Sequence, residues 1–64
     1  MKVFIEKENK HIELKKSLTG TQLLKELGYS SSSTLLVRNG EVILPDEQLS
    51  ENDDVQVLSV VSGG

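Results

Sequence analysis

Apolar and polar side chains alternate in two short segments near the start of the chain, residues 2–6 and 11–15. Such alternation is typical of half-buried β-strands. A polar stretch at 7–10 lies between them, so the pattern predicts an N-terminal β-hairpin. Phe4 falls on one face of this hairpin. The residues expected on its other face are Val3, Ile5, Ile12 and Leu14.

The hydrophobic period changes near residue 18, where a short helix is expected to begin. Thr19 is suited to be its N-cap, and Gln22 stands at the position that completes a capping box. Leu18 and Leu23 flank this box at the spacing of a hydrophobic staple. Gly28 is expected to end the helix in a left-handed conformation. The apolar stripe of this helix of about two turns consists of Leu23, Leu24 and Leu27.

The second half of the chain again has the pattern of strands. Thr34–Arg38 is apolar, and Asn39-Gly40 is the favoured pair for a type I′ turn. Residues 41–44 should therefore return antiparallel. The remaining segments are a serine loop at 30–33, an acidic turn region at 46–54 with Leu49 as its buried anchor, and a last strand at 55–60.

This order of elements predicts an α+β fold of the β-grasp, ubiquitin-like type over residues 1–61. One helix would cover one face of a mixed sheet of four to five strands, and the last strand would lie beside the first. Residues 62–64 would form a flexible tail. The core between sheet and helix is expected to contain Val3, Ile5, Ile12, Leu14, Leu23, Leu27, Val55 and Val57.

Size and composition narrow the functional classes. Sixty-four residues allow one domain, and 21 of them are Leu, Ile, Val or Phe, enough for a lean aliphatic core. A self-contained enzyme is not expected, because a catalytic cleft would take up too much of so small a core. Cysteine is absent, which excludes disulfides and thiolate metal sites. The single histidine, His11, has no partners in the sequence that would make it a metal ligand or a catalytic group.

No apolar run exceeds three residues, so neither a signal peptide nor a membrane span is expected, and the predicted compartment is the cytoplasm. The net charge of −3 is unevenly distributed. All seven Lys and Arg residues lie in residues 1–38. Residues 39–64 carry six acids instead: Glu41, Asp46, Glu47, Glu51, Asp53 and Asp54. This half is either a solubilising surface or a docking face for a basic partner. Direct nucleic-acid binding is disfavoured, because a clustered cationic surface is missing.

The chain ends in Gly63-Gly64. This dipeptide could be a frayed end or a cloning remnant. The functional interpretation is that a tail without Cβ atoms is slender, takes any backbone conformation and can thread a narrow channel. Its terminal carboxylate would then lie in another protein's active site. A carboxylate must be converted to an acyl-adenylate with ATP before a nucleophile can attack it.

Several of these segments together resemble the ubiquitin-like sulfur carriers. They are Met1–Glu6, the single capped helix, the Asn39-Gly40 hairpin and the closing residues 53–64. Relatives include ThiS of thiamin synthesis, MoaD of molybdopterin synthesis, and the TtuB-type carriers of tRNA thiolation with the archaeal small modifier proteins. The tail is most similar to the tRNA-thiolation branch. One departure is Asn52-Asp53, where many relatives have Gly-Asp. Because Asn tolerates a left-handed backbone, the turn is expected to survive.

The resemblance implies a carrier without a bound cofactor. An E1-like enzyme would use ATP to adenylate the carboxylate of Gly64, and a sulfurtransferase or persulfide would displace AMP to leave a thiocarboxylate. The acceptor enzyme would be a tRNA thiolase or, as the alternative, a thiazole synthase or a molybdopterin enzyme. A protein modifier that couples Gly64 to lysines of target proteins is a second hypothesis. A non-covalent binding module with incidental glycines is a third.

Strand parity adds a candidate docking surface. If Val55 and Val57 are buried, then Phe4, Leu58 and Val60 lie on the uncovered sheet face and form an apolar patch that leads to the tail. We expect this patch to bind the activating enzyme, while Ser62 and Gly63 thread its channel. The alternative is that these are scattered surface hydrophobes, which are common in soluble proteins.

Overall fold

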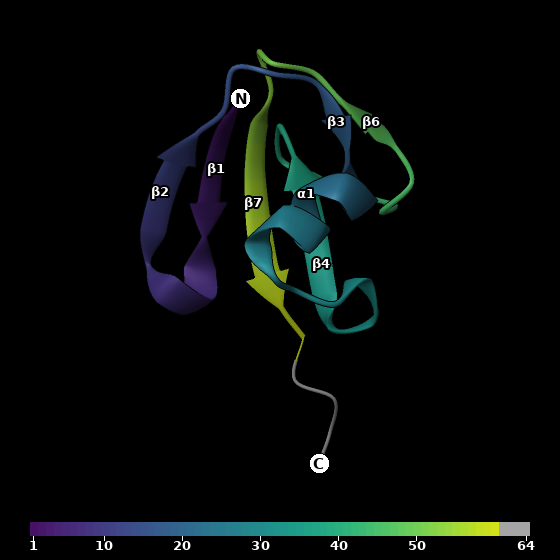
Figure 1. Cartoon of the computed structure of the whole chain (residues 1–64). Helices are drawn as coiled ribbons and strands as arrows, with labels where there is room; N and C mark the ends of the chain where they lie inside the picture. Colours follow the sequence, from purple (N-terminus) through teal and green to yellow (C-terminus); the bar gives the residue numbers. More distant parts are fainter. Residues whose placement is uncertain (61–64) are drawn as a thin grey trace.

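A mixed five-stranded sheet with one helix across it forms the body of the computed structural model, which describes residues 1–60 (Figure 1). Ser62, Gly63 and Gly64 lie outside the described residues. The strands of the large sheet are β1 (Lys2–Ile5), β2 (Lys10–Glu13), β4 (Thr34–Arg38), β5 (Glu41–Ile43) and β7 (Asp54–Ser59). The other elements are the helix α1 (Gly20–Leu27), two short strands, β3 (Leu18–Thr19) and β6 (Gln48–Leu49), and two 3₁₀ turns, η1 (Glu6–Glu8) and η2 (Ser31–Ser33).

Strand β7 occupies the centre of the sheet, whose order is β2-β1-β7-β4-β5. It runs parallel to β1, with Val55 beside Val3, and antiparallel to β4, with Leu58 beside Leu35. The last strand therefore fills the gap between two hairpins (Figure 1). The expected β-grasp arrangement, with the first and last strands adjacent, is confirmed.

The helix begins and ends at the residues that the sequence indicates. The Gln22 N–H donates to Thr19 Oγ1 at 3.2 Å, and the Thr19 N–H donates to Gln22 Oε1 at 3.0 Å, which completes the capping box. Gly28 adopts φ 83°, and the Tyr29 N–H then reaches back to the Leu24 carbonyl at 2.9 Å. Together these form a Schellman motif, so eight residues of helix have both ends satisfied.

A second, two-stranded sheet was not expected from the sequence. It pairs β3 with β6, with Leu18 beside Leu49. Both side chains are buried, so the anchor role expected for Leu49 is confirmed. The N–H groups of Gly20 and Thr21 continue this contact, because they donate to carbonyls of the β5–β6 loop at 3.0 Å and 2.6 Å. The acidic segment is thus tied to the start of α1.

The core contains most of the expected residues. Val3, Ile5, Leu23, Val55 and Val57 are at most 3% exposed. Ile12, Leu14 and Leu27 are partly buried and pack against this core, so they lie at its margin. The core also contains residues outside that predicted set, namely Met1, Leu18, Leu24, Leu36, Ile43 and Leu49. Leu36 was missed because it lies within an apolar run that shows no alternation.

Other differences are local. The polar segment after β1 is a 3₁₀ turn over Glu6–Glu8 followed by Asn9 at φ 48°, so β2 begins one residue earlier than expected. The serine run contains a 3₁₀ turn. The turn before β7 is present as expected. Asn52 does not have a positive φ, so the turn does not depend on a left-handed conformation at this residue. No helix within residues 1–60 is both long and apolar enough to cross a bilayer.

Candidate functional site

The candidate site begins where β7 ends, because the strand carries the chain toward the C-terminus. Ser59 pairs with Thr34, and the Val60 N–H donates to the Ser33 carbonyl at 2.9 Å. Strand β4 and the serine turn before it therefore hold β7 up to the last described residue. Ser62, Gly63 and Gly64, the residues predicted to thread a partner and react, follow this fixed point and lie outside the described residues.

A shallow hollow surrounds the end of β7. Tyr29 stands at this end, and its phenol O–H donates to the Glu8 carboxylate. That hydrogen bond, together with partial desolvation and the charge of Glu8, raises the pKa of the Tyr29 phenol above its usual value. The residues that line the hollow are Glu6, Lys7, Tyr29, Ser33, Thr34, Ser59 and Val60. Such a mixed polar rim can support a tail, but it offers no convergent acid, base and nucleophile.

The residues of the predicted patch belong to the sheet face opposite α1 or to the chain directly after it. Phe4 and Leu58 are half-buried there, and Val60 is 43% exposed. Phe4 lies beside Gln56 of β7, and its ring centroid is 4.5 Å from that of His11. The neighbour of Phe4 on β7 is therefore Gln56, and Leu58 lies two residues further along that strand. Its stacking on His11 gives that histidine a packing role.

Leu58 has apolar neighbours that the sequence analysis did not name. It pairs with Leu35 on β4, which is 42% exposed. Val37 of the same strand pairs with Val42 of β5, which is 66% exposed. We call Leu35, Val37, Val42 and Leu58 the outer strip. Side chains alternate between the two faces of β5, so Val42 lies on the face opposite the buried Ile43. The predicted turn could have pointed to Val42, but the apolar run on β4 gives no such signal for Leu35 and Val37.

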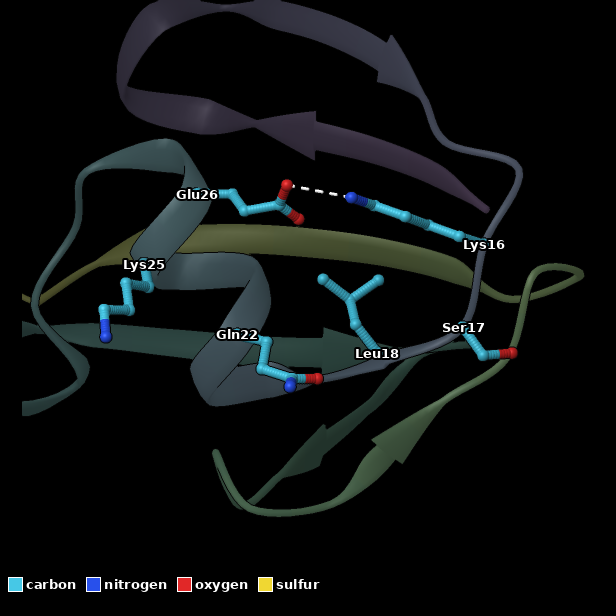
Figure 2. A pocket seen from close by; sticks show the side chains of 6 residues that line it. All are labelled: Lys16, Ser17, Leu18, Gln22, Lys25 and Glu26. Atoms are coloured by element: carbon cyan, nitrogen blue, oxygen red, sulfur yellow. Dashed lines mark hydrogen bonds and ion pairs between the residues drawn. The ribbon is translucent and has the colours of Figure 1, made fainter.

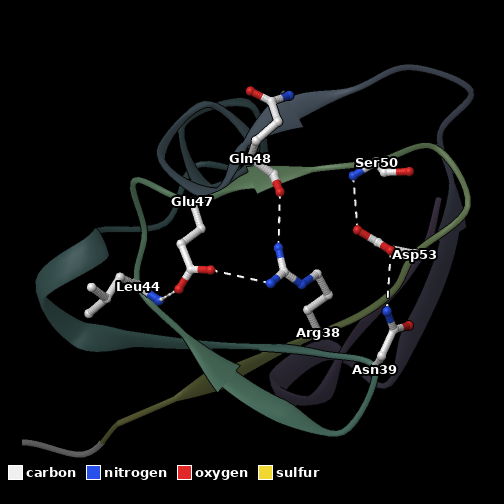
Figure 3. Close-up of polar contacts among 7 residues, drawn as sticks. All are labelled: Arg38, Asn39, Leu44, Glu47, Gln48, Ser50 and Asp53. Carbon is white, nitrogen blue, oxygen red and sulfur yellow. Dashed lines mark hydrogen bonds and ion pairs between the residues drawn. The ribbon is translucent and has the colours of Figure 1, made fainter.

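The acidic half of the chain is partly neutralised by its own contacts, which Figure 3 shows. Arg38 Nη2 lies 3.2 Å from Glu47 Oε1, and Arg38 Nη1 donates to the Gln48 carbonyl at 3.0 Å. Asp53 accepts from the Ser50 N–H at 2.9 Å and from the Asn39 amide at 3.2 Å.

These bonds, with the Ser50 N–H as the largest cause, hold the pKa of the Asp53 carboxyl below its usual value, although desolvation acts in the opposite direction. Two of the six acids, Glu47 and Asp53, therefore bind residues at the β4–β5 turn and stabilise its position. Within residues 1–60, no cluster of three or more His, Cys, Asp or Glu side chains is arranged to hold a metal ion.

A further hollow lies between α1 and the segment that precedes it (Figure 2). Lys16 Nζ and Glu26 Oε1 form an ion pair across it at 2.8 Å. The Gln22 amide, which also lines it, is engaged in the capping box. Because these polar groups serve the helix itself, the hollow is less suited to function than the end of β7.

Comparison with known proteins places these features in a family. The model of the ThiS family matches residues 2–64. The sulfur carrier protein TtuB of Thermus thermophilus is 33% identical over 57 residues, which cover 89% of this chain and 88% of TtuB.

Two solved structures of a thiamine biosynthesis protein from Geobacter metallireducens have the same fold. The crystal structure, of ThiS, superposes with a TM-score of 0.66 at 24% identity and covers both chains completely. The solution structure gives a TM-score of 0.62 at 23% identity, over 100% of this chain and 88% of the other. The family match spans nearly the whole sequence, the β-grasp fold agrees with it, and the chain accordingly belongs to the ThiS family of small sulfur carriers.

Proposed function

We propose that this protein carries sulfur as a thiocarboxylate on Gly64 and donates it for tRNA 2-thiolation. The observation that supports the proposal best is the 33% identity to TtuB over 89% of the chain, together with the Gly63-Gly64 ending. The position of β7 fits this role. Two neighbouring strands anchor it, so the terminal residues extend from a firmly held point.

The chemistry needs an activating partner, since a carboxylate does not react with nucleophiles at neutral pH. An E1-like adenylating enzyme would couple the Gly64 carboxylate to ATP and release pyrophosphate. The outer sulfur of a persulfide on a sulfurtransferase would then attack the acyl carbon and displace AMP. A thiol would cleave the S–S bond of the resulting acyl disulfide, which releases the thiocarboxylate and leaves a disulfide on the donor. In this scheme the chain supplies no catalytic side chain, and its part is to present the acyl group and to be recognised.

Recognition would depend on the sheet face beside the tail. Leu58 lies on β7 and Val60 directly follows that strand, and Leu35 extends the same apolar surface. Contact there would offset the cost of ordering the tail, which is about 1–2 kcal/mol per residue. Phe4, which lies beyond Gln56, would contact the margin of the same partner.

Intact-mass spectrometry tests the carrier proposal. The full chain, incubated with ATP, the adenylating enzyme and a sulfur donor, should gain the mass of one oxygen-to-sulfur exchange. A variant without Gly64 is the matched control and should gain nothing. If the full chain shows no exchange with an active partner, the carrier proposal is wrong. If the chain is instead found linked to lysines through Gly64, the protein-modifier hypothesis replaces it.

Thiamin synthesis is the second candidate pathway, which the match to the ThiS family model favours. Deletion of the gene separates the two. Loss of 2-thiouridine in tRNA with normal growth on medium without thiamin supports the proposed pathway. A requirement for thiamin with normal tRNA thiolation supports the alternative.

A further inference from the structure

The two edges of the large sheet differ in character. Edge strand β2 exposes the charged and polar side chains of Lys10, His11 and Glu13, which discourage pairing with another strand. Edge strand β5 exposes Val42 at 66%, and Leu44, directly after the strand, is 65% exposed. An exposed edge with apolar side chains is a template for an additional strand.

The backbone of β5 has its hydrogen-bonding groups available at one position. Asn39 and Gly40 both have positive φ, 51° and 87°, so they form a type I′ turn in which Arg38 and Glu41 are the hydrogen-bonded pair. Alternation along an antiparallel ladder then makes Val37–Val42 a non-hydrogen-bonded pair. The N–H and C=O groups of Val42 therefore point away from β4, toward the open edge.

The next outward position is already closed. The Leu44 N–H donates to Glu47 Oε2 at 3.0 Å (Figure 3). The Leu44 carbonyl accepts from the Glu47 N–H at 3.1 Å. A strand added to β5 would gain two backbone hydrogen bonds, both at Val42. Its remaining affinity must come from side chains packed on the exposed Val42 and Leu44.

Charge indicates what kind of strand fits. Residues 39–64 contain six acids and no Lys or Arg. Arg38, the nearest cation in the described chain, is engaged with Glu47 and the Gln48 carbonyl. Glu41 and Asp46 border the edge and are exposed. A second copy of the chain would bring the same acids together across the edge, whereas basic residues on a different partner would complement them.

We propose that β5 is a docking edge to which a partner protein adds an extended segment with alternating apolar residues and flanking Lys or Arg. This inference goes beyond the carrier function and does not depend on the reaction at Gly64. It assigns a role to the acidic half of the chain and to Val42, neither of which the tail chemistry uses.

The test uses the full chain, labelled with ¹⁵N, and the synthetic peptide Lys-Lys-Val-Thr-Val-Thr-Val-Lys-Lys at low salt. We expect chemical-shift changes centred on Glu41–Leu44 and slowed hydrogen exchange at the Val42 amide. A peptide with Glu in place of every Lys should bind at least about tenfold more weakly. Val42→Lys, at a site exposed enough to keep the fold, should weaken binding by a similar factor. His11→Lys, on the opposite edge, is the matched control and should leave binding unchanged.

Three results would overturn the proposal. One is equal binding of the two peptides, and another is a set of shifts confined to β2 or α1. The third is protection of the Val42 amide that rises with protein concentration in the absence of peptide, which would make a second copy of the chain the occupant. Because the mass-spectrometric test of Gly64 uses other partners and another readout, failure of one proposal does not imply failure of the other.

Discussion

Gly20 illustrates how a single position limits what the chain tolerates. A Cβ built on Gly20 would lie 2.7 Å from the Pro45 carbonyl oxygen and 2.4 Å from Leu36 Cδ1. A leucine methyl group can move aside, but the carbonyl already accepts from the Thr21 N–H and hydroxyl, so it cannot shift without loss of those bonds. In the sequence, Gly20 is marked only by its place directly after the predicted N-cap, Thr19. The structure shows that the loop after β5 leaves no room there for a side chain.

We therefore predict that Gly20→Ala destabilises the protein. Alanine gains at most about 1 kcal/mol from its lower backbone entropy in the unfolded chain. Overpacking costs about 1–3 kcal/mol, so it should outweigh that gain and lower the urea midpoint. Lys25→Ala, an exposed change on the same helix, is the control. It should change the free energy of unfolding by no more than about 0.5 kcal/mol. An unchanged or higher midpoint for Gly20→Ala would show that the loop can yield.

At the scale of elements, the turn between β4 and β5 is tied to the start of β7. The Asn39 N–H donates to the Asp54 carbonyl at 2.8 Å, and the Asp54 N–H donates to Asn39 Oδ1 at 3.0 Å. Asp53 completes the connection through Ser50 and the Asn39 amide. The Asn-Gly pair thus shapes a hairpin and also positions the strand that leads to the tail.

The lowered pKa of Asp53 makes this connection sensitive to pH. A carboxyl group with a lower pKa in the folded state stabilises the fold above its unfolded value of about 3.9 and loses that contribution as the pH falls through the folded value. Asp53→Asn should lower stability at pH 7 and reduce the loss on acidification below about pH 4. Urea titrations between neutral and acidic pH measure both. Asp46→Asn removes an exposed carboxylate of the same half outside this turn, and it should retain the original midpoint at pH 7. If Asp53→Asn shows the same acid dependence as the unaltered protein, the tether contributes nothing.

Elements whose signals are local could be predicted from the sequence, and those that depend on distant contacts could not. The capping box of α1 and the type I′ turn each rest on residues within four positions, and both are present as expected. The pairing of β3 with β6 joins segments of two residues that lie about thirty positions apart, too short to show a period. The alternation of side chains along β7 predicted the burial of Val55 and Val57, and both are buried. Residues 35–37 are all apolar, so the sequence does not show which of them face outward, and most of the outer strip was missed.

For the whole molecule, the same reasoning applies to the candidate site. The tail could be proposed from the sequence, because the chemistry proposed for it requires only glycines and a terminal carboxylate. The residues around the start of the tail could be identified only from the register of β1, β4 and β7. That register places Leu35, rather than Phe4, beside Leu58. The sheet thereby separates two surfaces: an apolar region that leads along β7 to the tail, and an acidic edge at β5. Each can be altered without changing the other.

This separation leads to a prediction about distance. Between Val60 and the terminal carboxylate the chain can span about 13 Å, at roughly 3.3 Å per residue. If the partner binds the sheet face and the carboxylate together, that length must match the path to its nucleotide site. Two glycines inserted after Val60 would lengthen the tail by about 7 Å and should lower kcat for adenylation about a hundredfold, with little change in KM. Leu58→Asp should do the reverse, raising KM with kcat nearly kept, because it removes docking contact and leaves the tail intact.

Pyrophosphate-exchange kinetics with the adenylating enzyme measure both constants. A variant with glycine at positions 61 and 62 keeps the length of the tail and is the control. Its kcat for adenylation should be closer to that of the unaltered protein than the kcat of the lengthened variant is. An unchanged kcat for the lengthened variant would mean that the enzyme recognises only the terminal glycines. In that case the fixed end of β7 does not set the position of the reacting carboxylate, and docking on the sheet face and reaction at Gly64 are independent events.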